Sequence, residues 1–103
     1  KINQAGTRYT PRHLQHYIDL LPEDSLFNAM GIGPSQLSAT THSLIAGGGA
    51  RVGFEDNIYF RKGELAKNNA QLVERAAAFA HDLGLEIASP AETRDILGIP
   101  QLN

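Results

Sequence analysis

A chain of 103 residues with 42% hydrophobic and 19% charged side chains has the composition of a single folded domain, which excludes a disordered protein. Its net charge of −2, without a run of Lys or Arg or an apolar stretch of membrane-spanning length, predicts no binding to nucleic acid and no membrane association. Cysteine is absent, which excludes disulfides and thiolate metal sites and fits a cytoplasmic location.

The first half of the sequence predicts two helices with a strand between them. Thr10 is suited to cap a helix, and Pro11 is suited to its first position. Residues 25–30 form a short apolar run that is typical of a buried strand. A second helix is expected to begin at Pro34 and to end before the three glycines at 47–49.

The second half predicts one more strand and two more helices. The strand is expected over residues 50–54. A helix with an apolar stripe is expected over residues 65–83, and Gly84 is suited to the position after its end. Ser89 opens a capping box, so the last short helix is expected to run from there to Gly98.

The alternation of strands and helices predicts an α/β fold with a parallel sheet. The chain begins without Met, and residues 1–6 resemble the end of a further strand, so we expect a piece of a longer protein. Three parallel strands would leave exposed edges, whereas parallel sheets are normally buried. A barrel with five further strands would remove these edges, although the alternation alone establishes only the α/β class.

The strand that begins at Ala50 carries the strongest chemical signal. On a regular strand Arg51 and Glu55 share one face, with Gly53 between them, while the apolar residues at 52 and 54 face the helices. In a barrel the charged face points inward, where charges are costly unless they are paired or bind a ligand. Glu55 would lie at the carboxyl end of the strand, where barrel enzymes hold their active sites.

The string Arg-Val-Gly-Phe-Glu-Asp-Asn at residues 51–57 resembles the last strand region of the β-keto acid cleavage enzymes, which include 3-keto-5-aminohexanoate cleavage enzyme. The resemblance continues through residues 63–75 and 88–98, and it covers nearly the whole chain. It implies that residues 1–103 are the C-terminal segment of one TIM-barrel domain, a (β/α)8 fold of which the chain forms about the last two to three βα units.

The same resemblance implies a zinc-dependent acyltransferase. Family members bind a divalent metal, usually zinc, through one Glu, which corresponds to Glu55, and two His in a His-x-His motif that this chain lacks. Arg51 and Asp56 correspond to a catalytic pair, and Asp56 is expected where the strand ends and the chain bends toward the Arg51 head. The implied reaction converts a β-keto acid and acetyl-CoA to acetoacetate and a new CoA thioester by retro-Claisen-type cleavage. A homo-oligomer, commonly a tetramer, is also implied.

Two points remain open at the level of sequence. Arg51, Glu55 and Asp56 equally fit a structural ion network in a non-catalytic α/β module. The turn containing Gly31 and Gly33 leads into a helix N-terminus, which favours anions such as a CoA phosphate or a substrate carboxylate, but it also fits a simple tight turn. The histidines at 13 and 16 are expected on a solvated helix face, and the histidine at 42 in packing or at the surface.

Overall fold

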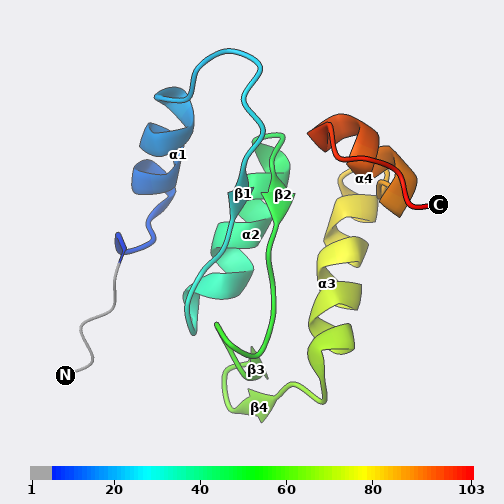
Figure 1. The fold of residues 1–103 in the computed structure, drawn as a ribbon. Helices are drawn as coiled ribbons and strands as arrows, with labels where there is room; N and C mark the ends of the chain where they lie inside the picture. The colour runs from blue at the N-terminus through cyan, green and yellow to red at the C-terminus, as the bar shows by residue number, and fades with distance from the viewer. Residues whose placement is uncertain (1–5) are drawn as a thin grey trace.

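The computed structural model describes residues 6–103, which form four helices and four short strands (Figure 1). The elements are α1 (Pro11–Asp19), β1 (Asn28–Ala29), α2 (Ser35–Ile45), β2 (Gly49–Ala50), β3 (Tyr59–Arg61), β4 (Glu64–Leu65), α3 (Asn69–Asp82) and α4 (Pro90–Leu97). The strand remnant expected at the start falls on residues 1–5, outside the described part. Within residues 6–103, no helix is long and apolar enough to cross a membrane.

The centre of the fold is a parallel pair of strands connected by a helix. β1 pairs with β2 in the register Asn28 with Gly49 and Ala29 with Ala50, and α2 connects them. Ser43 of α2 donates from its hydroxyl to the carbonyl oxygen of Gly49 at 2.6 Å. In Figure 1, α1 and α3 lie on opposite sides of this β1–α2–β2 unit. The predicted parallel, mixed α/β arrangement is therefore present in the described residues.

The buried side of α2 explains how the helix packs so closely on the strands. Its buried residues follow helical spacing and are small or polar: Gln36, Ala39, Thr40 and Ser43. Leu72 and Ala80 are the buried residues of α3. Many large apolar side chains elsewhere in residues 6–103 remain exposed.

The helix caps expected from the sequence are confirmed. The Thr10 hydroxyl accepts from the backbone N–H of His13 at 3.1 Å. Ser89 and Glu92 form the reciprocal capping box that begins α4, and Gly98 ends that helix in the left-handed conformation.

The expected start of the third helix at residue 65 is wrong. Residues 59–65 instead form an antiparallel hairpin of β3 and β4, in which Gly63 has a positive φ of 78°. α3 begins only at Asn69, because the Asn68 side chain accepts from the backbone N–H of Gln71 at 2.9 Å and caps the helix there.

The expected strand over residues 50–54 is also too long. Backbone pairing continues only to Arg51, whose N–H donates to the carbonyl of Ala29 at 3.0 Å. The chain then turns, and the N–H groups of Asp56 and Asn57 both donate to the carbonyl oxygen of Gly53, at 3.2 and 3.1 Å. The side chain of residue 54, expected to pack under helices, is instead on the exposed side of this turn.

Candidate functional site

Arg51 contacts two consecutive carboxylates at the carboxyl end of β2. Its Nη2 lies 3.2 Å from Oε2 of Glu55, and its Nε lies 3.5 Å from Oδ2 of Asp56. The Glu55 side chain is 85% exposed, whereas the Asp56 side chain is only 7% exposed. One guanidinium therefore connects an open carboxylate to a buried one.

The turn makes this arrangement possible. On a regular strand Glu55 and Asp56 would point to opposite faces, and Glu55 would share the face of Arg51. That expectation is wrong for these residues, because the chain has left the strand before it reaches them. The expectation that Asp56 lies at a bend and reaches the Arg51 head is confirmed by their 3.5 Å contact.

Three hydrogen bonds from other elements hold the turn. Gln36, fully buried in the first turn of α2, donates from Nε2 to the carbonyl oxygen of Gly53 at 3.2 Å. Asn69, the first residue of α3, accepts from the N–H of Phe54 at 2.8 Å. Gly33 donates from its N–H to the carbonyl oxygen of Asp56 at 2.7 Å. Loops that follow both parallel strands are thereby fixed to one another.

Gln36 and Asn69 were not predicted to hold the site. Gln36 lies on the buried side of α2, where a side-chain amide must find a partner. Its Oε1 has no hydrogen-bond partner within the described residues. Gln36 also lines a cavity of about 10 Å³, which is close to the smallest volume that holds a water molecule.

The glycines before α2 are required by geometry. A Cβ on Gly31 would lie 2.4 Å from the carbonyl oxygen of Ser35, so no side chain fits there without movement of the backbone. Gly33 has a φ of 58°, a left-handed conformation that other residues adopt only with strain. Both glycines therefore shape the loop that contacts Asp56. These backbone requirements alone explain why glycine occupies both positions, without a ligand.

The Glu55 side chain is open enough to hold a metal. Carboxylates are zinc ligands, and of the two Glu55 oxygens only Oε2 forms an ion pair within residues 6–103. No group of three or more His, Asp or Glu side chains that could share a metal occurs in this part of the chain. The residues present thus fit one ligand of a catalytic zinc site, which generally has three protein ligands.

Among the described residues, the histidines at 13, 16 and 42 make no hydrogen bond or ion pair with Arg51, Glu55 or Asp56. His13 and His16 are exposed on α1, as expected. His42 contacts Gln15 of α1 through its Nε2, at 3.1 Å from the amide oxygen, and lies 3.4 Å from the Tyr9 hydroxyl. His42, expected in packing or at the surface, is half-buried and contacts α1 and Tyr9.

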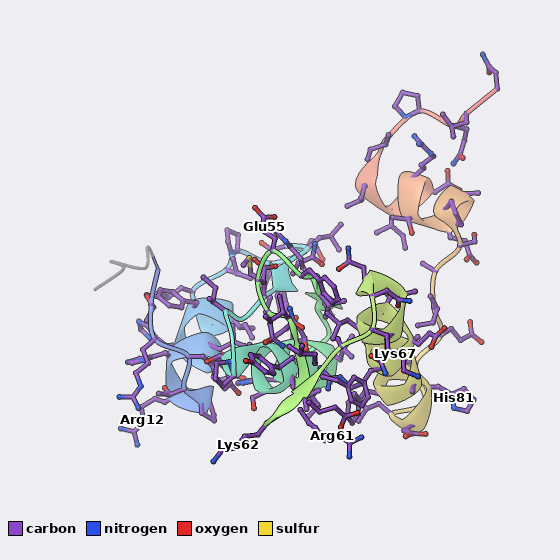
Figure 2. The ribbon with its side chains drawn as sticks, turned by 90° about the horizontal axis from the view of Figure 1, so that it is seen from below. Arg12, Glu55, Arg61, Lys62, Lys67 and His81 are labelled. Carbon is purple, nitrogen blue, oxygen red and sulfur yellow. The ribbon has the colours of Figure 1, made fainter. Side chains whose placement is uncertain are left out.

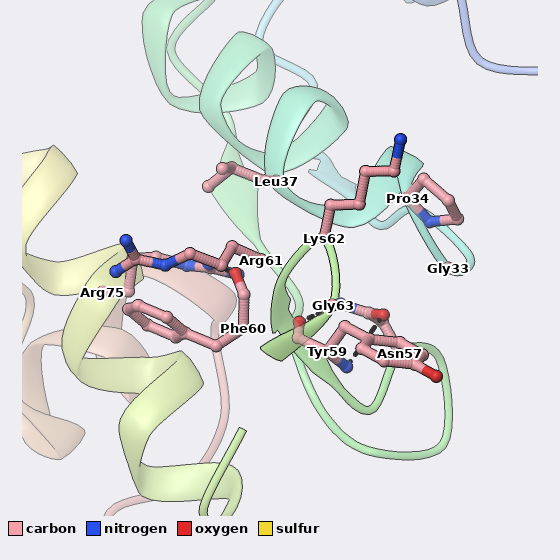
Figure 3. A pocket seen from close by; sticks show the side chains of 10 residues that line it. All are labelled: Gly33, Pro34, Leu37, Asn57, Tyr59, Phe60, Arg61, Lys62, Gly63 and Arg75. Carbon is pink, nitrogen blue, oxygen red and sulfur yellow. Dashed lines mark hydrogen bonds between the residues drawn. The ribbon is translucent and has the colours of Figure 1, made fainter. Parts of the chain in front are cut away.

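A wide groove of about 990 Å³ lies beside the turn (Figure 3). Its lining comes from the loops after β1 and β2, the first part of α2, the β3–β4 hairpin and α3: Gly33, Pro34, Leu37, Asn57, Tyr59, Phe60, Arg61, Lys62, Gly63 and Arg75. The Arg75 guanidinium lies 4.4 Å from the centre of the Phe60 ring and donates to the Phe60 carbonyl oxygen. Burial, followed by the nearby positive charge of Arg61, lowers the pKa of Arg75.

Comparison with known proteins decides the family. The model of the family described as beta-keto acid cleavage enzyme matches residues 3–99. The chain belongs to this family. Its resemblance at the Arg51 to Asn57 string is thus part of a match over nearly the whole length.

Three similar curated proteins are named as cleavage enzymes or as an acetyltransferase. A 3-keto-5-aminohexanoate cleavage enzyme of Acetoanaerobium sticklandii is 43% identical over 95 residues, 92% of this chain and 35% of the relative. Another, from Fusobacterium nucleatum subsp. nucleatum, is 44% identical over 85% of this chain and 32% of its own length. A 3-oxoadipate:acetyl-CoA acetyltransferase of Cupriavidus necator is 38% identical over 84% of this chain and 31% of its own. The chain spans about a third of the length of these curated relatives.

Proposed function

We propose that the chain is the C-terminal part of a zinc-dependent acyltransferase, which converts a β-keto acid and acetyl-CoA to acetoacetate and a CoA thioester by retro-Claisen-type cleavage. The observation that carries the proposal is the Arg51 guanidinium between exposed Glu55 and buried Asp56 at the carboxyl end of a parallel strand. Family membership and the names of the relatives, which include an acetyl-CoA acetyltransferase, support the substrate classes.

The complete domain is proposed to be a TIM barrel, with β1–α2 and β2–α3 as its last two βα units. The parallel pairing of β1 with β2 supports this arrangement. A second hollow, of about 450 Å³, lies between β2 and α3 and is lined largely by apolar residues that include Ala50, Val73 and Ala77. Another strand beside β2 would cover this surface, since exposed apolar patches of this kind usually contact other protein.

Glu55 is proposed to hold zinc, together with two His from outside this chain. Bound zinc supplies a Lewis acid that polarises the keto oxygen of the substrate. The open position of the Glu55 carboxylate supports this role, because a metal and its other ligands need access to the oxygen atoms. A liganding carboxylate must be ionised.

Arg51 and Asp56 are proposed to act as a pair on the substrate. The carbon between the two carbonyl groups of a β-keto acid is acidic, and in this proposal the Asp56 carboxylate accepts a proton from it. The Arg51 guanidinium orients Asp56 from 3.5 Å and offsets the negative charge that remains on the substrate. Gly33 and Gln36 donate hydrogen bonds to the backbone of this turn, and Asn69 accepts one from it, and these contacts keep the pair in place.

The alternative is a non-catalytic module in which Arg51, Glu55 and Asp56 form only a structural ion network. The Arg51 contacts to both carboxylates fit this interpretation too. The exposure of Glu55 favours the enzyme, because an exposed ion pair contributes only about 0–1 kcal/mol to stability and gives Glu55 little structural purpose.

Acetoacetate formation by the full-length protein tests the proposal. We expect it to form from a β-keto acid such as 3-oxoadipate only when acetyl-CoA is present, and to stop when zinc is removed with a chelator. Recovery on adding zinc back would exclude damage by the chelator. A full-length protein that folds and binds zinc but forms no acetoacetate from any β-keto acid would support the structural alternative.

A further inference from the structure

The groove beside the turn lies at the same end of the strands as the proposed active site. Gly33 lines the groove and also donates its N–H to the carbonyl of Asp56 at 2.7 Å. The groove therefore begins where the Arg51–Asp56 pair is held. In Figure 2, however, the side chains of Glu55 and Lys62 lie at opposite edges of the molecule, so the groove leads away from the proposed metal ligand.

The groove carries an excess of positive charge. Three cationic side chains line it: Arg61, Lys62 and Arg75. Arg61 has an acidic partner, Glu64, at 2.8 Å, but within residues 6–103 neither Lys62 nor Arg75 forms an ion pair. Arg75 is fixed by the Phe60 carbonyl and ring, and its lowered pKa reflects burial and the like charge of Arg61. An anionic ligand would relieve this accumulation of charge.

The rest of the lining is apolar. Pro34 and Leu37 form one side of the groove, and Tyr59 and Phe60 of the hairpin form the other. Figure 3 shows Lys62 reaching from the hairpin toward Pro34. A ligand that matches this lining combines a flat heteroaromatic ring with several phosphate groups. A β-keto acid lacks both features.

We propose that the groove binds the 3′-phosphoadenosine diphosphate end of acetyl-CoA, with Lys62 and Arg61 at the phosphates and the adenine against the apolar lining. This inference rests on the proposed function, from which acetyl-CoA is taken. The pantetheine arm separates the nucleotide of coenzyme A from its thioester, which agrees with a groove that starts at the Asp56 turn and leads away from Glu55. Loops after the last strands of barrels often bind phosphate in this way.

The test compares two thioesters in the full-length enzyme. Acetyl-CoA carries the nucleotide, whereas acetyl-pantetheine carries the same thioester without it. In Lys62→Ala the ratio of kcat/KM for acetyl-CoA to kcat/KM for acetyl-pantetheine should fall about tenfold, as for loss of one charged hydrogen bond. Lys67→Ala is the matched control, because Lys67 is also exposed but does not line the groove, and it should keep the wild-type ratio.

Direct binding separates failure of the groove from failure of the proposed function. Calorimetric titration with desulfo-coenzyme A needs no turnover, and Lys62→Ala should bind about tenfold more weakly than wild type and Lys67→Ala. Equal binding by all three proteins, or no binding by the wild type, would overturn the groove assignment even if the enzyme forms acetoacetate. Binding that depends on Lys62 in a protein without turnover would support the groove and count against the reaction.

Discussion

The backbone N–H of Gly33 donates to the carbonyl oxygen of Asp56 at 2.7 Å, so the loop after β1 holds the loop after β2. Because Gly33 has a φ of 58°, its replacement strains the loop even though the space around a new Cβ is open. The proposed catalytic carboxylate thus depends on a glycine in a neighbouring loop.

Gly33→Ala tests this dependence. In the full-length protein it should lower the free energy of unfolding by about 1–2 kcal/mol and also lower kcat, because the strained loop no longer fixes Asp56. Gly98→Ala is the matched control, since Gly98 has a φ of 66° and open space but ends α4. It should cost similar stability in chemical denaturation and leave kcat unchanged. Equal kcat in both variants would refute the coupling.

Arg51→Lys should lower kcat by more than about tenfold with little change in folding. The guanidinium reaches Glu55 through Nη2 and Asp56 through Nε, and a single ammonium group does not reproduce this fork. Steady-state kinetics and circular dichroism would check the two parts. Kinetics close to wild type would show that Arg51 forms only a structural ion pair and takes no part in catalysis.

Gln36→Glu should make stability depend on pH. Position 36 is fully buried and faces the carbonyl oxygen of Gly53, so the Glu must stay protonated in the folded state to donate there. Its folded pKa is then raised above the unfolded value, and stability is present at low pH and lost as the pH rises above about 4.3. Gln36→Leu, which cannot ionise, is the control. Parallel pH profiles of unfolding for the two variants would disprove the contact.

The stability of α4 should show the opposite pH dependence, because of Glu92. Hydrogen bonds from the Ser89 backbone and then from its hydroxyl lower the pKa of Glu92. A lowered folded pKa means that the cap is intact above the ordinary Glu range and is lost as the pH falls below it. The protection factors of amides 90–97, which correct for the slower intrinsic exchange in acid, should therefore fall as the pH falls, and less so in Ser89→Ala. Protection factors that do not change with pH would show that the Glu92 carboxylate does not stabilise the cap.

Local signals in the sequence predicted the parts of the fold that depend on local contacts. Thr10 and Ser89 cap their helices because the side-chain acceptor and the N–H group it binds are three residues apart. The resemblance of residues 51–57 to the family also brought together Arg51, Glu55 and Asp56, which the structure places in contact.

The end of β2 could not be predicted in the same way. The alternation of apolar and polar residues after Ala50 is that of a strand, but the chain turns because Gln36 and Asn69 bind the backbone of residues 53 and 54. Both partners come from other elements, so no local pattern reveals them. The hairpin before α3 was missed because Leu65 fits the helical spacing, while the Asn68 cap sets the actual start.

We propose metal binding for Glu55 and proton transfer for Asp56. Zinc content and turnover of the full-length variants Glu55→Gln and Asp56→Asn measure the two roles separately. Glu55→Gln should lose zinc and activity together, because the neutral amide is a poor zinc ligand. Asp56→Asn should retain zinc and lose about 100-fold in kcat, the scale of a general base. If Asp56→Asn instead sheds zinc while Glu55→Gln keeps it, the assignment of the two carboxylates is contradicted.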